Sequence, residues 1–204
     1  MGRTSDAKER LMEAVLELIW KGSYGSTTID LICDKAGVKK GSFYYFFESK
    51  ADLASAALLA NWEEYRPKMD VTFSPSIPPL ERLKNYCDQS FKKQSEMRCS
   101  CGSVLGCPIF TLGAEICTQD DKLRLTVQDV LGLYRKYLES TIRDAQAEGL
   151  VRAGDPAIMA RMMFAYMEGV MTQARIHNDP SILKDQYPGM MAILGAKQTE
   201  AVSV

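Results

Sequence analysis

The segment from Lys39 to Tyr45 combines side-chain types that contact nucleic acids. Lysine ammonium groups can neutralise phosphates, and the hydroxyls of Ser42 and Tyr44 lie two positions apart, so both can face a groove. Gly41 lacks a side chain and lets the backbone approach DNA closely. The segment therefore predicts a DNA-binding surface. Its candidate residues, with the lysine that follows it, are Lys39, Lys40, Gly41, Ser42, Tyr44, Tyr45 and Lys50.

A capped helix and a glycine turn must position that segment. Thr27 or Thr28 can accept a hydrogen bond from the free N–H groups at a helix start, and Gly37 suits the left-handed residue at its end. Apolar residues recur between them at helical spacing and predict one buried face. They are Ile29, Ile32, Cys33 and Ala36. A second short helix from about residue 40 to 47 completes a helix-turn-helix, whose second helix fits the DNA major groove.

These residues closely resemble the TetR family of bacterial repressors. The resemblance covers roughly residues 8–55, and its strongest parts are Thr28, residues 36–38, residues 40–47 and residues 50–53. It implies that Thr28, Tyr45 and Lys50 hold phosphates. It implies likewise that Lys40, Ser42 and Tyr44 approach bases. It further implies a homodimer in which a three-helix DNA-binding head joins a larger helical body for ligand binding and dimerisation.

The remaining pattern predicts an all-α chain. We expect helices over residues 50–69, 80–97, 108–116, 120–148 and 155–177. A last helix is expected from Pro180, interrupted or kinked at Pro188 and Gly189. The residues between Cys99 and Cys107 are expected to form a loop, and prolines from Pro67 to Pro79 a break between helices. We predict a DNA-binding domain over residues 1–50, a ligand-binding and dimerisation domain over residues 51–204, and a frayed tail after Lys197.

The body carries side chains that suit a pocket for a small-molecule effector. For each of them an ordinary core position is the simpler interpretation. The candidates are Trp62, Tyr65, Tyr86, Phe110, Tyr134, Tyr137, Phe164 and Arg175. The helix over residues 155–177 is rich in methionine and also carries Ala165 and Gly169, which would let two helices approach closely. We expect this helix and the last one to form the homodimer interface.

Four of the six cysteines, Cys99, Cys101, Cys107 and Cys117, crowd into one stretch, and three interpretations stay open. Four thiolates can hold zinc, although the usual spacing of two close pairs is missing. Cys107 precedes Pro108 at a predicted helix start, where free N–H groups favour a reactive thiolate. Residues 106–115 also resemble the TetR subgroup that includes the repressor of N-ethylmaleimide reductase, which implies electrophile or oxidant sensing. The third interpretation is small thiols that only pack.

Composition excludes several classes of protein. The formal net charge of the 204 residues is −1, so any DNA affinity must come from placed cations rather than bulk charge. The one histidine, His177, and the lack of a recognisable nucleophile or phosphate loop argue against an enzyme, and no cofactor is implied.

No apolar run is long enough for a membrane span, and no signal peptide is seen, so we expect a cytoplasmic protein. The partners expected are double-stranded operator DNA, a small-molecule effector and a second copy of the chain.

Overall fold

The first three helices form the predicted helix-turn-helix head. The computed structural model describes residues 3–196, and α1 (Arg3–Lys21) is followed by α2 (Ile29–Ala36) and α3 (Lys40–Phe46). The Thr28 hydroxyl oxygen accepts a hydrogen bond from the N–H of Leu31 and caps α2. Gly37 ends α2 with φ 61°, a left-handed conformation that glycine adopts without strain. The turn between α2 and α3 is thus built from local chemistry.

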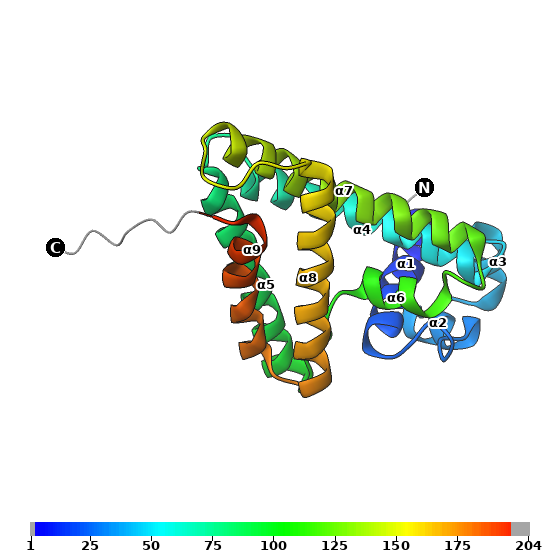
Figure 1. Cartoon of the computed structure of the whole chain (residues 1–204). Helices are drawn as coiled ribbons and strands as arrows, with labels where there is room; N and C mark the ends of the chain where they lie inside the picture. Colours follow the sequence, from blue (N-terminus) through cyan, green and yellow to red (C-terminus); the bar gives the residue numbers. More distant parts are fainter. Residues whose placement is uncertain (1–2, 197–204) are drawn as a thin grey trace. The chain divides into compact units, whose positions relative to one another are not determined.

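Helices make up the rest of the described chain, and the predicted all-α class is confirmed (Figure 1). The described residues contain no strand, and none of their helices is long and apolar enough to cross a membrane. The helices after the head are α4 (Lys50–Thr72), α5 (Pro79–Cys101), α6 (Pro108–Ile116), α7 (Asp121–Ala147), α8 (Pro156–His177), a 3-10 helix (Pro180–Asp185) and α9 (Gln186–Leu194).

Three expected breaks differ in the structure. Helix α4 runs past its expected end at Met69 to Thr72 with Pro67 inside it, and Met69 and Phe73, the latter directly after the helix, are buried. Helix α5 extends to Cys101, so Cys99 and Cys101 lie in a helix rather than a loop. The last helix is interrupted between Asp185 and Gln186 rather than at Pro188. Pro188 therefore lies in the first turn of α9, where backbone N–H groups have no partner within the helix. The expected frayed tail lies outside the described residues.

The described chain forms two compact units. The first unit contains the residues up to Pro67 together with Cys107–Gly132, and the second contains Lys68–Gly106 together with the residues from Leu133 onward. The first therefore includes α6 and the first part of α7 as well as the head. Its buried core includes Leu11, Ile32, Phe43 and Leu53.

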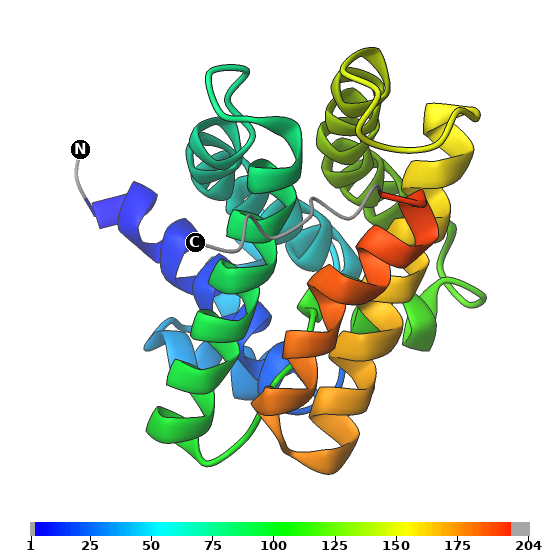
Figure 2. The ribbon, with the colours of Figure 1, turned by 60° about the vertical axis from the view of Figure 1, so that its left-hand side comes forward.

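The second unit is a helical bundle in which α9 packs against both α5 and α8 (Figure 2). At one end Val104, Ala174 and Leu183 form a buried cluster. Gln94, also buried, accepts hydrogen bonds from the N–H groups of Leu105 and Gly106 and fixes the chain that leads to α6.

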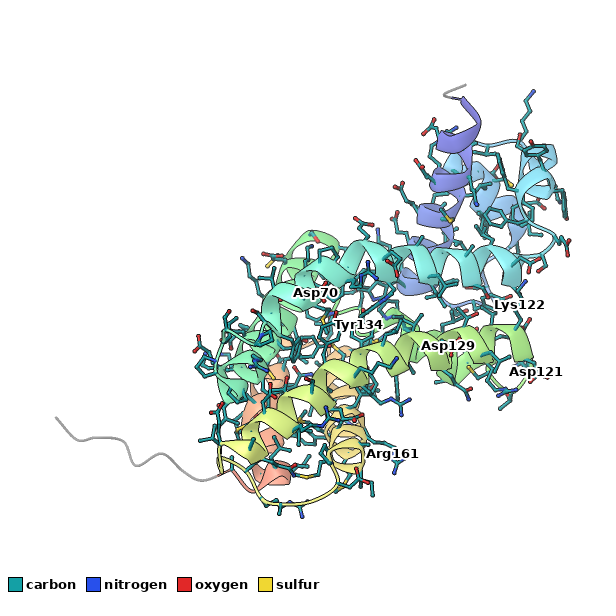
Figure 3. The ribbon with its side chains drawn as sticks, turned by 90° about the horizontal axis from the view of Figure 1, so that it is seen from above. Asp70, Asp121, Lys122, Asp129, Tyr134 and Arg161 are labelled. Carbon is teal, nitrogen blue, oxygen red and sulfur yellow. The ribbon has the colours of Figure 1, made fainter. Side chains whose placement is uncertain are left out.

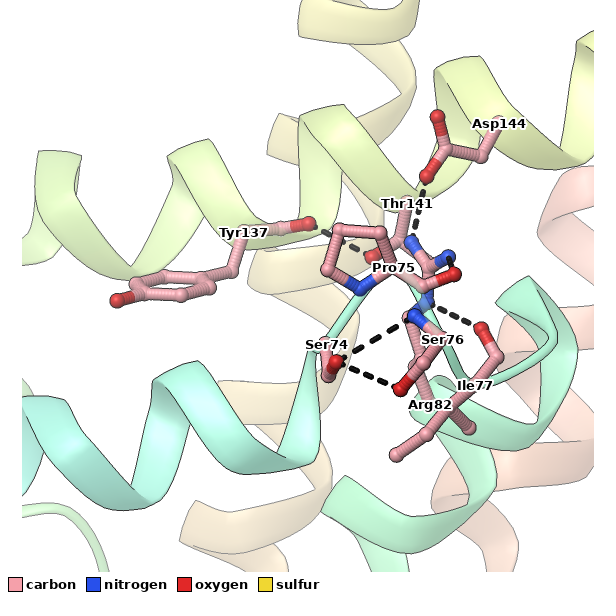
Figure 4. Close-up of polar contacts among 8 residues, drawn as sticks. All are labelled: Ser74, Pro75, Ser76, Ile77, Arg82, Tyr137, Thr141 and Asp144. Carbon is pink, nitrogen blue, oxygen red and sulfur yellow. Dashed lines mark hydrogen bonds and ion pairs between the residues drawn. The ribbon is translucent and has the colours of Figure 1, made fainter.

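A buried arginine fixes the loop between α4 and α5 (Figure 4). Arg82 is 4% exposed, and its guanidinium donates to the carbonyl oxygens of Ile77 and Pro75. The same group pairs with the carboxylate of Asp144 on α7 at 2.5 Å. Because a buried guanidinium is stable only when its donors are satisfied, these contacts lock the loop conformation.

Candidate nucleic-acid interface

Helix α3 has one buried and one exposed face. Phe43 is 0% exposed and Phe47 is also buried, so these two rings anchor the helix in the head. Tyr44 and Tyr45 are 55% and 76% exposed. Both rings are therefore accessible to a partner. Their predicted contacts with bases and phosphates stay predictions.

The start of α3 is open on its outer side. A Cβ atom built at Gly41 would meet nothing within 4 Å, so packing inside the protein does not require glycine there. Lys39 is exposed at the N-cap position, and its side chain makes no capping hydrogen bond. Ser42 is half-buried. The open surface at Gly41 agrees with the predicted close approach of DNA.

Lys40 forms an ion pair with Asp30 of α2 at 2.7 Å, and both side chains are more than half exposed. The hydrogen bond to Asp30 raises the pKa of Lys40, so the ammonium stays charged. An exposed ion pair of this kind exchanges readily for another partner. Lys40 therefore keeps its predicted access to DNA, with Asp30 as a competing acceptor that the sequence did not reveal.

Thr28 combines a structural contact with an exposed position. Its oxygen accepts the N–H of Leu31 at 3.2 Å, which leaves the O–H donor of the same hydroxyl for another acceptor. A phosphate at the start of α2 could accept this hydrogen. The predicted phosphate contact is thus compatible with the capping role.

Lys50 differs from the simple surface cation that the sequence suggested. Its ammonium group donates to the carbonyl oxygens of Tyr24 and Thr27, both at 2.7 Å, and lies 4.0 Å from the centre of the Tyr24 ring. Burial lowers the pKa of Lys50. Only one of its three N–H donors is left for a phosphate. Lys50 holds the turn between α1 and α2, and its phosphate contact stays a prediction.

Glu115 of α6 binds the same turn and was missed by the sequence reasoning. One carboxylate oxygen accepts the N–H of Tyr24 at 2.9 Å, and the other accepts the N–H of Gly25 at 2.7 Å. No local pattern predicts this contact, because the partners are 90 residues or more apart in the chain.

The start of α7 contacts the start of α4 inside the first unit. Lys122, labelled in Figure 3, forms an ion pair with Asp52 in the first turn of α4. The hydrogen bond from Lys122 lowers the pKa of Asp52. Two charged side chains on either side of the turn between α6 and α7 thus make contacts within the first unit: Glu115 with the turn between α1 and α2, and Lys122 with the start of α4.

The candidate ligand residues fall in both compact units. Trp62, Tyr65 and Phe110 belong to the first unit. The others belong to the second: Tyr86, Tyr134, Tyr137, Phe164 and Arg175. Trp62 and Phe164 are buried, and Phe110 is exposed. A shared effector pocket stays a prediction.

Within the second unit the structure brings two candidate tyrosines together. Tyr86 and Tyr137 pack their rings on Phe73 with centroids 5.3 and 5.4 Å away. The Tyr137 hydroxyl donates to Asp70. This cluster places apolar ring faces beside polar groups, a combination common in ligand sites and in ordinary cores.

The four crowded cysteines do not form one metal site. Cys107 and Cys117 cap opposite ends of α6, which at 1.5 Å per residue separates them by about 15 Å. Ligands of one zinc ion must all lie about 2.3 Å from it, so the four-thiolate alternative is wrong. No group of three or more His, Cys, Asp or Glu among the residues the structure describes is placed to hold a metal.

The predicted helix-capping position of Cys107 is confirmed. Its sulfur accepts the N–H of Phe110 at 3.5 Å, and Pro108 occupies the first turn. The thiol is half-buried, whereas Cys99 and Cys101 are exposed in the last turn of α5. The sensing role of Cys107 stays a prediction.

Family models match most of the chain. Residues 11–57 match the model of bacterial regulatory proteins of the tetR family, and residues 79–187 match the tetracyclin repressor-like C-terminal domain. The chain is 30% identical to the transcriptional regulator AcuR of Cereibacter sphaeroides over 179 residues, which cover 87% of this chain and 80% of that protein. It is 24% identical to the Escherichia coli repressor NemR over 176 residues, 84% of this chain and 85% of NemR.

Solved structures agree with these matches. The crystal structure of a TetR regulatory protein from Rhodobacter sphaeroides is 28% identical, with a TM-score of 0.81 over 92% of this chain and 98% of that chain. The reduced form of Escherichia coli NemR gives a TM-score of 0.82 at 20% identity, over 95% of this chain and 100% of NemR. The latter likeness concerns the fold alone.

Proposed function

The chain belongs to the TetR family of bacterial regulatory proteins, and from this premise we propose that it is a homodimeric repressor released from operator DNA by a small-molecule effector. It is a DNA-binding transcriptional regulator of a family whose members typically have no enzymatic activity. Operator DNA lies in the bacterial cytoplasm, so we place the protein there.

The observation that carries the proposal is the exposed face of α3. The buried anchors Phe43 and Phe47 hold the helix, while Tyr44 and Tyr45 stand in solvent beside the open position at Gly41. This arrangement suits insertion of α3 into a major groove. In a dimer the two α3 helices would need to reach successive major grooves about 34 Å apart, so a modest change in their separation weakens both contacts together.

One face of α8 supports the proposed dimer. Exposed residues at helical spacing form a mostly apolar stripe along the helix, which includes one polar residue, Thr172: Ile158, Met162, Ala165, Gly169, Thr172 and Ile176. A Cβ at Gly169 would meet nothing within 4 Å in one copy of the chain, so this glycine leaves room for a partner helix. Such a stripe would be buried in an apolar interface between two copies.

The dimer is tested by a bulky residue on the stripe. Gly169→Leu should yield monomers at micromolar concentration in sedimentation experiments, while the wild type sediments as a dimer. The control Ala157→Leu lies about 120° from Gly169 around the helix and should stay dimeric. A monomeric wild type would contradict the proposal.

DNA binding is tested with the full-length protein and random duplexes. Repeated selection should enrich a palindromic duplex, which the wild type binds at least about 1,000-fold more tightly than random DNA. The segment upstream of the protein's own gene is the first natural candidate to test. A wild type that enriches no sequence would overturn the proposal.

Cys107 supports a second candidate, a repressor that responds to electrophiles or oxidants. Its sulfur caps α6, so alkylation would remove a capping contact of this helix. The relative NemR was crystallised in a form described as reduced. If the candidate holds, limiting maleimide modifies Cys107 first and releases DNA, while Cys107→Ser stays bound. Uniform labelling of exposed thiols without DNA release would exclude it.

A further inference from the structure

The turn between α1 and α2, residues 23–27, is held by two opposite charges. Lys50 donates to its carbonyl oxygens at Tyr24 and Thr27, and Glu115 accepts its N–H groups at Tyr24 and Gly25. Lys50 comes from the start of α4, next to the head, while Glu115 comes from α6. Four backbone groups of one short turn are therefore fixed by charge-assisted hydrogen bonds, which are the stronger kind.

The fit of Glu115 against the turn is close. A Cβ atom at Gly25 would lie 3.1 Å from a carboxylate oxygen of Glu115, tighter than ordinary van der Waals contact. Gly25 does not have a positive φ, so its backbone alone would tolerate alanine. Glycine at this position is explained by the approach of the carboxylate.

The turn leads directly into the helix-turn-helix. Thr27 lies immediately before Thr28, which caps α2, and α2 packs against both α1 and α3. A displacement of the turn must therefore shift α2, because packed helices move as rigid elements. Helix α6 also packs against α1, so its position and that of the turn are physically connected.

We propose that Glu115 is a positioning residue through which α6 sets the orientation of the helix-turn-helix, so that a shift of α6 changes the affinity for operator DNA. The inference rests on the proposed function, since it states how that DNA-binding head is regulated. Glu115 does not touch DNA in this scheme. It transmits the position of α6 through the two N–H groups that it accepts.

The first experiment is a double-mutant cycle between Gly25→Ala and Glu115→Ala in the full-length protein. Each single change should weaken binding to the selected duplex about tenfold, because the two N–H groups that fix the turn lose or misplace their charged acceptor. The double variant should bind no more weakly than Glu115→Ala alone, because the added methyl group then has nothing to displace. Glu96→Ala removes an exposed carboxylate of α5 and should bind as the wild type does.

The second experiment moves α6 without an effector. A Cβ at Gly113 would lie 2.9 Å from a methyl carbon of Val127 on α7, so Gly113→Ala should displace α6. With Glu115 present, this change should alter duplex affinity by at least about threefold, and with Glu115→Ala by less than about 1.5-fold. Equal effects in the two backgrounds would overturn the coupling.

Further measurements separate positioning from a general loss of structure. In Glu115→Ala, hydrogen exchange should accelerate at the Tyr24 and Gly25 amides, while the slope of log Kd against log salt stays unchanged because no phosphate contact is removed. Glu115→Gln keeps one acceptor oxygen and should give an intermediate affinity. Wild-type affinity in both Glu115 variants would refute the inference, whereas a wild type that selects no duplex would refute the proposed function instead.

Discussion

Each compact unit contains a loop held by a cation, but the two cations bind different kinds of acceptor. In the second unit Arg82 holds the loop between α4 and α5 and pairs directly with Asp144. In the first unit Lys50 holds the turn between α1 and α2 through two carbonyl oxygens, and the carboxylate of Glu115 from α6 accepts two N–H groups of the same turn. The loop between α4 and α5 is thus held by a direct ion pair, whereas the turn between α1 and α2 is held jointly by side chains from α4 and α6.

These two ways of holding a loop suggest different roles: the Arg82 contacts stabilise the second unit, and the Lys50 contacts influence the DNA-binding head. A guanidinium with a direct carboxylate partner and two carbonyl acceptors has no low-energy alternative, so it favours one conformation. A turn held from two separate helices follows whichever of them moves. We expect changes at Arg82 to affect mainly the stability of the second unit, and changes at Lys50 to affect the DNA-binding head.

Two buried thiols allow this comparison to be measured one unit at a time. Cys33 lies in α2 of the first unit and Cys87 in α5 of the second. Burial raises the pKa of Cys33, and it raises the pKa of Cys87 to about 12. Both thiols should react with maleimide only when their own unit opens.

The largest effect is expected for Arg82→Met. The change leaves the loop carbonyls of Ile77 and Pro75 without their donors, so it should lower the free energy of unfolding by about 2–4 kcal/mol in urea titrations. Cys87 should then react faster and Cys33 at its wild-type rate. The control Arg143→Met breaks an exposed pair with Glu139 and should cost less than about 1 kcal/mol. Similar costs for the two variants would contradict the role given to Arg82.

Lys50→Met should have the next largest effect on stability. It should expose Cys33 to maleimide rather than Cys87, the opposite of the result expected for Arg82→Met. Loss of two charge-assisted hydrogen bonds should cost about 1–3 kcal/mol, with faster reaction at Cys33 and no change at Cys87. Binding should weaken for all DNA sequences alike. A salt slope that flattens by about one unit would show an additional phosphate contact, and an unchanged slope would limit Lys50 to holding the turn.

Tyr44→Ala tests the exposed face of α3 rather than the contacts that hold the turn between α1 and α2. The change should cost about 1–3 kcal/mol in binding to the selected duplex and little with random DNA, because an exposed ring facing a groove reads sequence. Urea titrations should show wild-type stability, since the ring is exposed. Equal losses on both duplexes would remove Tyr44 from the base-reading set.

The smallest effect is expected for Asp30→Asn. Removing this competing carboxylate frees Lys40 for DNA, so affinity for any duplex should rise about two- to threefold at low salt. Stability should not change, because both side chains of the pair are exposed. Weaker binding in Asp30→Asn would mean that the ion pair instead presents Lys40 in the orientation that DNA requires.

The sequence by itself determined the head and the helical class. Thr28, Gly37 and the faces of α2 and α3 act through caps, turns and helical spacing, which operate over a few residues. The capping position of Cys107 was readable for the same reason, because Pro108 marks the start of α6. Local chemistry also made the exposed candidates on α3 identifiable before the fold was known.

Only the tertiary structure decided which partners the charged residues take. Lys50 was readable as a cation, yet its burial against Tyr24 depends on how α4 packs on the head. Glu115 carries no local signal, because its partners lie 90 residues or more away in the chain. Helical spacing also could not show that α4 extends beyond Met69 to Thr72. Short-range patterns specify helices and their ends, whereas contacts across long stretches of chain depend on the packing that brings those helices together.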